Sequence, residues 1–312
     1  MAERSESPGA PRVAVLVLNF KTSEMTTGCI ESLERVLQTP PLVLLMDNGS
    51  GAYQERLLGE FVAQRPHCRL LLFQENLGYC AAMNRGLAAA AEAGAEYALF
   101  LNSDVTTDED FLAPLVAVLD NDPSVAGVSP TVLLPHGKVW CQGASVGFSS
   151  NLVRLHGLGK DPAPRSAGPC AVGFLPGACV LYRLDALTAV GGIDESYFMY
   201  FEDSALGAAL RAHGHTLLWL PWVRVIHHPS ASSGGGRSPL RKFMMAVNSV
   251  RYLRSHFSVK LWAAWFLFDV IGLPLAYLAG GVRAGWAKTT GLARGLLGHR
   301  VTAADVVRWL DP

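Results

Sequence analysis

The chain has 312 residues, of which 50% are hydrophobic and 17% are charged, and its 26 basic and 26 acidic side chains give a net charge of zero. This composition excludes a disordered or collagen-like chain. It also argues against a general nucleic-acid binder, because phosphate neutralisation needs a surplus of Lys and Arg. The length suits about two structural units, or one large α/β domain with an appendage.

The charges are unevenly distributed along the chain. Residues 1–233 hold 15 basic and 23 acidic side chains, whereas residues 234–312 hold 11 and 3. An acidic body with a basic tail is typical of a protein that rests on an anionic membrane, although a merely solvated tail is the alternative. Residues 1–11 lack the apolar core of a secretory signal, so we expect them to be disordered and the protein not to be exported. The six cysteines have no C-x-x-C spacing, and we expect reduced thiols in or near the core.

Apolar runs that end in polar residues predict buried parallel strands. In the first hundred residues these runs are 13–18, 42–46, 70–73 and 97–101. The segments between them with helical spacing are 29–37, 53–62 and 81–93. Strands that alternate with helices predict an α/β fold with a mainly parallel sheet flanked by helices.

The same pattern continues less regularly further along the chain. We expect strands at 125–133, 178–182, 216–220 and 223–226, and helices at 111–119, 184–190 and 204–212. Residues 137–176 are rich in Gly, Pro and Ser and show little periodicity. A long irregular segment of this kind is often a lid or a binding loop.

Polar side chains cluster where the predicted strands end. They are Asn19, Asp47 with Asn48, Asn76, and the triplet Asn102-Ser103-Asp104. In an open parallel sheet, ligands bind outside the carboxyl ends of the strands, so four such positions favour a binding site. Each of them could also be an ordinary turn.

Two common nucleotide motifs are missing. The turn after the first strand is Asn19-Phe20-Lys21-Thr22-Ser23, which has none of the glycines that let a backbone approach a dinucleotide pyrophosphate. The Gly234-Gly235-Gly236-Arg237 run lacks the lysine and the hydroxyl of a P-loop. NAD chemistry and P-loop chemistry are therefore not expected.

Asp104 is the candidate metal ligand. It follows a predicted buried strand, and Mg²⁺ and Mn²⁺ are commonly held by one or two carboxylates together with substrate phosphates. His227 and His228 end a late strand and could add a donor, although paired histidines are more often packed or solvated.

Glu202 and Asp203 are the candidate catalytic acids. They follow the aromatic run Tyr197–Phe201 at a predicted helix start, where burial would raise a carboxylate pKa and the helix dipole would lower it. Ordinary helix capping is the alternative for this pair alone. Together with a metal-binding acid, a carboxylate here suits transfer from a diphosphate-activated donor: a cation offsets charge on the leaving diphosphate while the carboxylate takes a proton from the attacking hydroxyl.

Seven ordered blocks carry a resemblance to a known family. They are VAVLVLNF, MDNGS, ENLGYCAAMNRGL, LFLNSDV, GFLPGACVLYRLDAL, VGGIDESYFMYFEDSAL and VIHHPSASSGG. Over residues 12–236 the chain resembles the family 2 glycosyltransferases, inverting enzymes with a GT-A fold, and particularly their bacterial rhamnosyltransferase-like branch.

The resemblance implies a role for each matching residue. Asn19 and Asp47 would contact the nucleotide, Asn76 and Gly78 would line the donor pocket, Asp104 would bind the metal and His227 would approach the metal or the diphosphate. Asp203 would be the catalytic base, Glu202 its supporting neighbour, and Gly177 with Ala178 the wall between donor and acceptor. We also expect Asn102 and Ser103 on the donor side.

Two positions depart from the family pattern. Asn102 replaces the first acid of the usual D-x-D, and Ala205 replaces an acid often found after the base. With a single carboxylate the cation is expected to bind weakly until the donor diphosphate adds its oxygens. We therefore expect activity to need added Mg²⁺ or Mn²⁺ and Asp104→Ala to abolish it.

The tail contains an apolar stretch, residues 261–281, with one charge in twenty-one residues. This length meets the roughly 20 residues of a spanning helix. However, Asp269 at mid-bilayer would cost about 2.5 to 3.5 kcal/mol, and the tryptophans belong at an interface. We therefore expect interfacial docking ahead of spanning, with packing onto the catalytic body as the third option. Basic residues on both sides of the stretch would suit anionic headgroups or a lipid diphosphate.

The predicted organisation is a disordered segment at 1–11, a GT-A catalytic domain at 12–236 and a basic, apolar, membrane-associating helical tail at 237–312. The expected activity is transfer of a sugar, with dTDP-rhamnose a candidate donor, to a glycan or polyprenyl-diphosphate-linked acceptor at the cytoplasmic face of the cell membrane. The alternatives are a non-catalytic sugar-nucleotide binding protein and, less favoured, a nucleotidyltransferase. The sugar, the acceptor and the oligomeric state are left open by the sequence.

Overall fold

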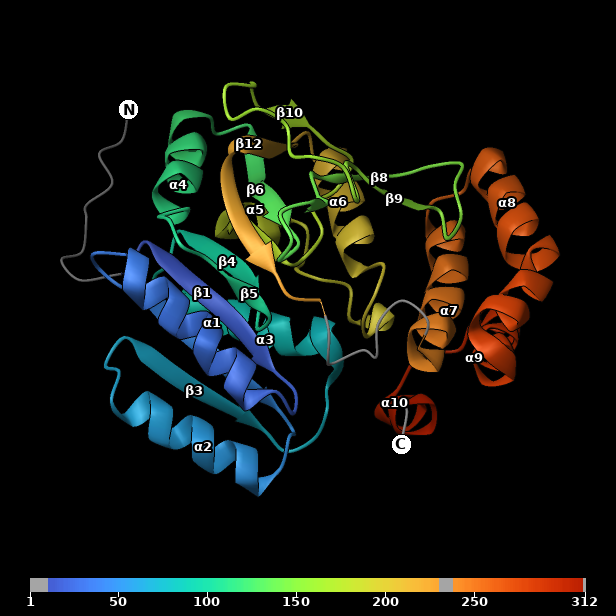
Figure 1. Ribbon diagram of the computed structural model, residues 1–312, viewed down its shortest axis with the longest axis horizontal. Helices are drawn as coiled ribbons and strands as arrows, with labels where there is room; N and C mark the ends of the chain where they lie inside the picture. Colours follow the sequence, from blue (N-terminus) through green and yellow to red (C-terminus); the bar gives the residue numbers. More distant parts are fainter. Residues whose placement is uncertain (1–10, 230–237, 311–312) are drawn as a thin grey trace.

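A computed structural model describes residues 11–229 and 238–310, and Figure 1 shows an α/β body followed by a group of C-terminal helices. The expected N-terminal disorder at 1–10 and the glycine run before Arg237 lie outside the described residues.

One large sheet forms the centre of the body. Its strands are β1 (Val13–Asn19), β2 (Leu42–Asn48), β3 (Cys68–Phe73), β4 (Tyr97–Asn102), β5 (Val105–Thr106), β6 (Val125–Leu133), β7 (Val139–Cys141), β10 (Cys170–Ala171), β11 (Cys179–Arg183) and β12 (Thr216–His227). The main path runs β10-β12-β6-β11-β4-β1-β2-β3, with β5 beside β12 and β7 beside β6. β11 runs antiparallel to β4 and β6, and this is the departure from a parallel sheet that matters for the site.

The helices of the body are α1 (Ser23–Val36), α2 (Ala52–Ala63), α3 (Gly78–Glu92), α4 (Leu112–Asn121), α5 (Leu184–Ala189), a short 3₁₀ turn η1 (Glu195–Tyr197) and α6 (Glu202–Ala212). Those of the tail are α7 (Pro239–Ser255), α8 (Val259–Trp265), the π-helical segment η2 (Phe266–Ile271), α9 (Leu273–Leu296) and α10 (Ala303–Trp309).

The alternation of side chains along β1 builds two hydrophobic layers. Val13, Val15 and Val17 face the layer that contains α1, α2 and α4, whereas Ala14 and Leu16 face the layer that contains α3, α5 and α6. A strand that is covered on both faces must be apolar at every position, which explains the uninterrupted apolar runs of the sequence.

Three expectations from the sequence differ from the structure. The segments at 216–220 and 223–226 form one strand, β12, whose pairing with β6 has an irregularity between Leu220 and Arg224. The irregular stretch at 137–176 contains β7, β10 and a separate two-stranded hairpin of β8 (Ala144–Val146) and β9 (Val153–Leu155). All six cysteines are free thiols and five are buried, but Cys170 is exposed, which corrects the expectation for that residue.

The tail is helical, and α7 packs along α9 through shared buried residues of both helices. The apolar stretch is broken rather than continuous: η2 ends before Gly272, and Pro274 stands in the first turn of α9. Among the described residues no single helix meets the length and hydropathy expected of a membrane span. Val259–Ile271 and Leu273–Leu296, which are bent by 50° relative to each other, meet them only as a pair.

Candidate functional site

The sheet topology gathers the predicted site residues at one edge. Asn19, Asp47 and Asn102 end parallel strands, and β12 runs in the same direction to its end at His227. Because β11 is antiparallel to β4, it begins at this edge, directly after Gly177 and Ala178. The carboxyl ends of the strands therefore face one space, where an open α/β sheet binds its ligand.

Asp104 and His227, the predicted metal ligands, are brought together by a short ladder. His227 pairs with Val105 through β5 and β12, and the His228 backbone N–H donates to the Asp104 carbonyl at 2.8 Å. The His227 Nε2 atom lies 3.1 Å from Asp104 Oδ1, and the two side chains are 7% and 17% exposed. The edge of the Trp140 ring, in β7, packs against His227 with 4.5 Å between centroids.

The donor atoms of this pair suit a divalent cation. Asp104 Oδ1 faces His227 Nε2 at 3.1 Å, and among the described residues neither Asp104 Oδ1 nor His227 Nδ1, on the far side of the ring, has a hydrogen-bond partner of good geometry. Unsatisfied buried polar atoms are uncommon and often mark a place for a ligand or ion. One carboxylate oxygen and one imidazole nitrogen match the preferences of Mn²⁺, with the remaining positions open to oxygens of a substrate.

Asn19 and Asp47 are held against each other at the ends of β1 and β2. The Asn19 amide donates to Asp47 Oδ1 at 2.6 Å, and Asp47 Oδ2 accepts from the Ser50 N–H at 3.0 Å. Asn19 Oδ1 accepts from Thr26 at 2.8 Å. Both side chains are 0% exposed, so in this structure they fix the two loops at the rim. Their direct contact with a nucleotide stays a prediction.

Asn76 and Gly78 form part of a polar turn before α3. Asn48 donates to Asn76 Oδ1 at 2.9 Å, and the Gly78 N–H donates to the same oxygen at 2.9 Å. Gly78 has a φ of +83°, and an added Cβ would lie 2.7 Å from the ring of Phe198. Only glycine can occupy this backbone conformation under that ring without strain. The turn is therefore packed against the chain segment that leads to the predicted catalytic acids, Glu202 and Asp203.

Gly177 and Ala178 lie beside the loop that carries Asp104, the predicted metal ligand. The Asn102 N–H donates to the Ala178 carbonyl at 2.9 Å, in line with the pairing of Cys179 and Leu101. Asn102 and Ser103 are both half-buried at this edge. An added Cβ on Gly177 would lie 3.1 Å from the hydroxyl oxygen of Tyr79. Glycine thus lets this hydroxyl approach the wall that separates the predicted donor and acceptor sides.

Glu202 and Asp203 open α6 and line a small pocket. Its other walls are Tyr79, Phe100, Leu175, Gly177, Tyr182, Ile193 and Leu206. Removal from water raises the pKa of Asp203 to about 6. The hydrogen bond that the Ser204 N–H donates to Asp203 Oδ1, at 2.7 Å, acts in the opposite direction and lowers this pKa. Burial and the neighbouring Asp203 charge raise the pKa of Glu202 to about 8. At neutral pH the pair therefore carries one proton, with Asp203 ionised and Glu202 neutral.

The segment before these acids has an unusual backbone. Phe198, Tyr200 and Phe201 have φ values of 63°, 70° and 72°, in the left-handed region that side chains disfavour. Phe198 is the centre of a γ-turn, with ψ −62° and a Met199 N–H to Tyr197 carbonyl bond of 2.7 Å. Such strain of order 1–3 kcal/mol per residue persists only where the surroundings hold it, and it clusters at functional sites.

Asn248 in α7 holds this strained segment. Its amide nitrogen lies 2.8, 2.9 and 3.0 Å from the carbonyl oxygens of Tyr197, Met199 and Tyr200, and its side chain is 0% exposed. The sequence indicated neither Asn248 nor Tyr79 as a site residue. Tyr79 stands inside the block ENLGYCAAMNRGL and could have been noticed there, whereas Asn248 has no local signal.

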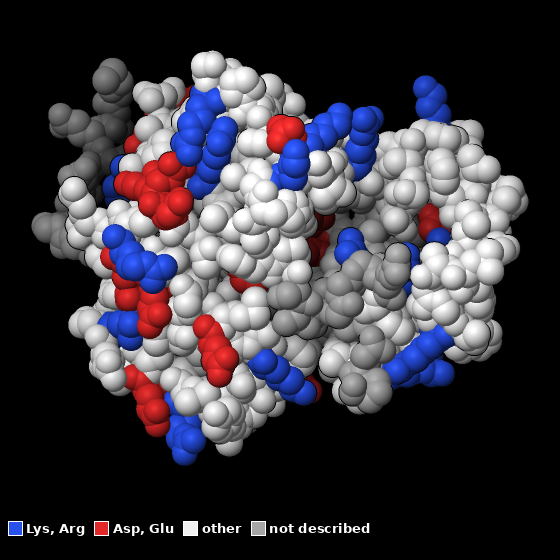
Figure 2. Space-filling view, viewed as in Figure 1, with Lys and Arg blue, Asp and Glu red and all other residues white. Residues whose placement is uncertain are grey.

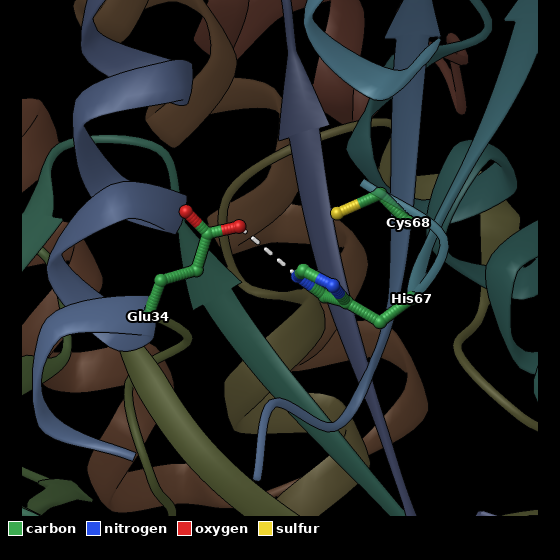
Figure 3. Close-up of side chains that lie close together, drawn as sticks. All are labelled: Glu34, His67 and Cys68. Carbon is green, nitrogen blue, oxygen red and sulfur yellow. Dashed lines mark ion pairs between the residues drawn. The ribbon is translucent and has the colours of Figure 1, made fainter. Parts of the chain in front are cut away.

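One further group could hold a metal, at the opposite edge of the sheet. Figure 3 shows Glu34, His67 and Cys68 close together, with His67 Nε2 3.1 Å from Glu34 Oε1. The same oxygen accepts from Arg65 at 2.8 Å, which puts a fixed positive charge beside the would-be ion. Burial, followed by the Glu34 charge, raises the pKa of the Cys68 thiol to about 11, whereas a metal ligand must be a thiolate. We interpret the cluster as a structural ion pair.

The sequence is similar to known glycosyltransferases. A model of glycosyl transferase family 2 matches residues 14–190. N-acetylglucosaminyl-diphospho-decaprenol L-rhamnosyltransferase of Mycobacterium tuberculosis is 31% identical over 244 residues, covering 70% of this chain and 77% of that protein. O-antigen biosynthesis protein RfbC of Myxococcus xanthus is 28% identical over 258 residues, covering 78% of this chain but 19% of that protein.

Solved structures with a similar fold have low sequence identity. GalNAc-T7 with UDP, GalNAc and Mn²⁺ aligns with a TM-score of 0.60 and 13% identity, over 85% of this chain and 58% of that one. A mannosyltransferase from Pyrobaculum calidifontis in complex with GDP-Man and Mn²⁺ aligns with a TM-score of 0.54 and 16% identity, over 96% and 79%. These neighbours support the GT-A-like fold with a mixed, mostly parallel sheet flanked by helices. The chain therefore belongs to glycosyl transferase family 2.

Proposed function

We propose that this glycosyltransferase moves a sugar, with inversion at the anomeric carbon, from a nucleotide-diphosphate sugar to a hydroxyl of a lipid-linked saccharide. One observation carries the proposal: a metal-competent pair, Asp104 and His227, and a carboxylate pair, Glu202 and Asp203, are linked through neighbouring strands. The hydrogen bond from the Asn102 N–H to the Ala178 carbonyl joins the loop that carries Asp104 to the Gly177–Ala178 segment. Gly177 in turn lines the pocket that contains Asp203.

The protonation of the carboxylates suits a single displacement. Asp203, with a pKa raised to about 6, is ionised at neutral pH yet basic enough to accept a proton. The acceptor hydroxyl oxygen would bond to the anomeric carbon as its proton passes to the Asp203 carboxylate. The bond from that carbon to the diphosphate oxygen would break, and the nucleoside diphosphate would leave. Glu202, kept neutral by burial and by the Asp203 charge, adds no repulsion toward an anionic donor.

Asp104 and His227 would hold Mg²⁺ or Mn²⁺. Such an ion supplies positive charge that stabilises a leaving diphosphate. The buried Asp104 Oδ1 and His227 Nε2, which face each other at 3.1 Å, support this assignment, and the Mn²⁺ in both structural neighbours is consistent with it. Trp140 packs against the imidazole and would limit its rotation.

A lipid-linked acceptor is supported by the mycobacterial relative and by the surface of the tail. The relative's name specifies an N-acetylglucosaminyl-diphospho-decaprenol acceptor. Several apolar side chains of η2 and α9 are exposed, with Ile271 at 58%, Leu275 at 67% and Leu278 at 82%. An apolar face beside basic residues favours interfacial docking on an anionic membrane. We propose that this docking takes place at the cytoplasmic face of the cell membrane.

Donor hydrolysis by purified protein tests the proposed chemistry. A panel of dTDP-rhamnose and of UDP-, GDP- and dTDP-hexoses is first screened for thermal stabilisation, since a ligand at 100 times its Kd adds about 2.7 kcal/mol. The stabilising donor is then incubated with Mn²⁺ or Mg²⁺, and release of nucleoside diphosphate is measured. We expect slow release that EDTA stops and that Asp104→Ala or Asp203→Asn abolishes.

Controls separate chemistry from binding. Asp161→Asn removes an exposed carboxylate that pairs with Lys138 on the surface, and it should leave hydrolysis unchanged. Full hydrolysis in EDTA would contradict the metal assignment. Donor binding with no hydrolysis and no transfer, in the presence of metal and acceptor, would favour a non-catalytic sugar-nucleotide binding protein. Retention of anomeric configuration in the product would refute the inverting mechanism.

A further inference from the structure

A second cavity, with three basic residues among the seven that line it, lies between the tail and the β8–β9 hairpin. It has a volume of about 110 Å³ and is lined by Asn151, Arg241, Lys242, Met245, Ala246, Asp269 and Lys288. These residues come from α7, η2, α9 and the loop between β8 and β9. Figure 2 shows that the molecule is hollowed between the α/β body and the tail, with charged side chains at the recess. None of the lining residues belongs to the catalytic pocket described above.

The charges of this cavity do not balance. Arg241, Lys242 and Lys288 bring three positive charges, whereas Asp269 brings one negative charge. Asp269 is engaged with Lys288 at 2.8 Å, and their side chains are only 4% and 9% exposed. Burial lowers the pKa of Lys242, and the nearby charges of Lys288 and Arg241 lower it further. A bound anion would offset this repulsion, because cations removed from water need a partner of opposite charge.

Asp269 also has an unused acceptor. Its Oδ2 atom is buried and has no hydrogen-bond partner among the described residues, although Oδ1 contacts Lys288. A buried, unpartnered carboxylate oxygen costs free energy unless a donor reaches it. A sugar hydroxyl next to a bound phosphate could be this donor. The cavity thus offers cations for phosphate and an acceptor for a polar neighbour of that phosphate.

The surroundings of the cavity favour a lipid-linked phosphate over a soluble one. The elements that supply Asp269 and Lys288 also carry exposed apolar side chains, with Phe266 at 54% and Trp286 at 55% exposed. The hairpin reaches the same region, because the Phe148 and Phe268 rings meet at 5.7 Å between centroids. A soluble phosphate would contact only the cations of the cavity. A lipid diphosphate would use both the cations and the adjacent apolar surface.

The cavity is connected to the catalytic acids through α7. The Arg241 guanidinium lies 5.8 Å from the centroid of the Tyr200 ring, two residues before Glu202. One face of α7 thus supplies Arg241 and Lys242 to the cavity, while Asn248 holds the carbonyls of the strained segment. An anion at Arg241 would stand close to the segment that positions Asp203.

From the cation surplus, the free Asp269 oxygen and the flanking apolar surface, we infer that this cavity binds the diphosphate of a polyprenyl-diphosphate-linked saccharide, the acceptor of the reaction. Arg241 and Lys242 bind the phosphates, the Asp269–Lys288 pair borders the first sugar, and the prenyl chain runs onto the exposed apolar side chains of η2 and α9. This inference rests on the proposed function and names the site at which its acceptor is held.

Vesicle flotation without any donor tests the site independently of catalysis. Full-length protein is mixed with neutral phosphatidylcholine vesicles that contain polyprenyl diphosphate, polyprenol, or phosphatidylglycerol at the same surface charge as the diphosphate. We expect tighter binding to the diphosphate vesicles than to either of the others, and competition by inorganic pyrophosphate. The variant Arg241→Gln/Lys242→Gln should weaken binding to the diphosphate vesicles by tenfold or more.

Matched variants keep the test decisive. Lys260→Gln/Arg300→Gln removes two exposed tail cations that lie outside the cavity, and it should lower binding to diphosphate and phosphatidylglycerol vesicles alike while leaving the preference for the diphosphate intact. Lys242→Arg keeps the charge and should retain binding, and thermal unfolding checks that each variant is folded. Equal binding to phosphatidylglycerol and diphosphate vesicles, or equal losses in both double variants, would overturn the inference. Donor hydrolysis by the unaltered protein tests the proposed function separately, so the two failures are distinguishable.

Discussion

Replacing Asn248 by alanine should separate the positioning of the catalytic acids from donor binding. The Asn248 amide nitrogen lies within 3.0 Å of three carbonyl oxygens in a segment with three left-handed residues. Its two protons serve at least two of those carbonyls, and each buried acceptor left unpaired costs about 1–3 kcal/mol. The free energy of unfolding should therefore fall by about 2–6 kcal/mol, and the strained backbone should relax.

Relaxation would move Asp203, which lies two residues after Phe201, the last residue of the strained segment. A displacement of about 1 Å in a reacting group can cost about 100-fold in rate. For Asn248→Ala we expect kcat for sugar transfer to fall by about 10- to 100-fold while the donor KM stays within about twofold. Because the environment of Asp203 changes, the acid limb of its pH–rate profile should also shift, which a purely structural residue would not cause.

The assay measures transfer across pH together with urea unfolding of each variant. Ser249→Ala is the matched control, since Ser249 is equally buried on α7 but its hydroxyl donates only within the helix, to the Ala246 carbonyl at 3.0 Å. It should leave kcat and the pH limb unchanged. The reasoning fails if Asn248→Ala loses stability but keeps its kcat and its pH limb, or if the loss lies in the donor KM alone.

Three further predictions concern the same site. Gly78→Ala should destabilise the protein by more than Gly137→Ala in urea unfolding, because both have φ above +80° but only at Gly78 would the Cβ meet Phe198, at 2.7 Å; equal losses would show that packing is irrelevant. The rate of transfer should rise through pH 6 as Asp203 ionises, and a flat profile from pH 5 to 7 would exclude it as the base. Burial raises the pKa of Glu202 from 4.5 to about 8, so the folded protein loses stability as pH rises from about 4.5 to about 8. Relative to the unaltered protein, Glu202→Gln should therefore gain up to about 5 kcal/mol between about pH 4 and pH 9 in urea unfolding, and a pH-independent difference would refute this.

Much of the catalytic body was predictable from the sequence, for physical reasons. Strands covered on both faces must be apolar throughout, so β1, β2 and β4 stand out and their polar ends mark the ligand edge. Their predicted ends agree with the structure to within two residues. Asp104 and His227 meet because the short strand β5, directly after Asp104, pairs with the end of β12.

Contacts that depend on the third dimension were not predictable in this way. Asn248 lies in the buried face of an ordinary helical pattern, and nothing near it in sequence indicates that it holds Tyr197 and Tyr200. The state of Glu202 was equally open, because burial and the helix start act in opposite directions on its pKa. The structure decides in favour of burial, since desolvation is the largest influence on both carboxylates.

Asp269 has a clear signal in the sequence and also takes part in a contact that the sequence does not predict. In the sequence it is the single charge of an apolar stretch, and it argues against a spanning helix. In the structure the π-helical turn of η2 directs its carboxylate inward to Lys288, so the acid leaves the outer face of the tail apolar while helping to line a cavity with a surplus of cations. The polar group that makes the stretch unsuitable for the middle of a bilayer is thus the group that an interfacial enzyme could use. The same placement puts the proposed lipid-diphosphate site on the helices that we propose to face the membrane and, through α7, against the segment that leads to the proposed base, Asp203.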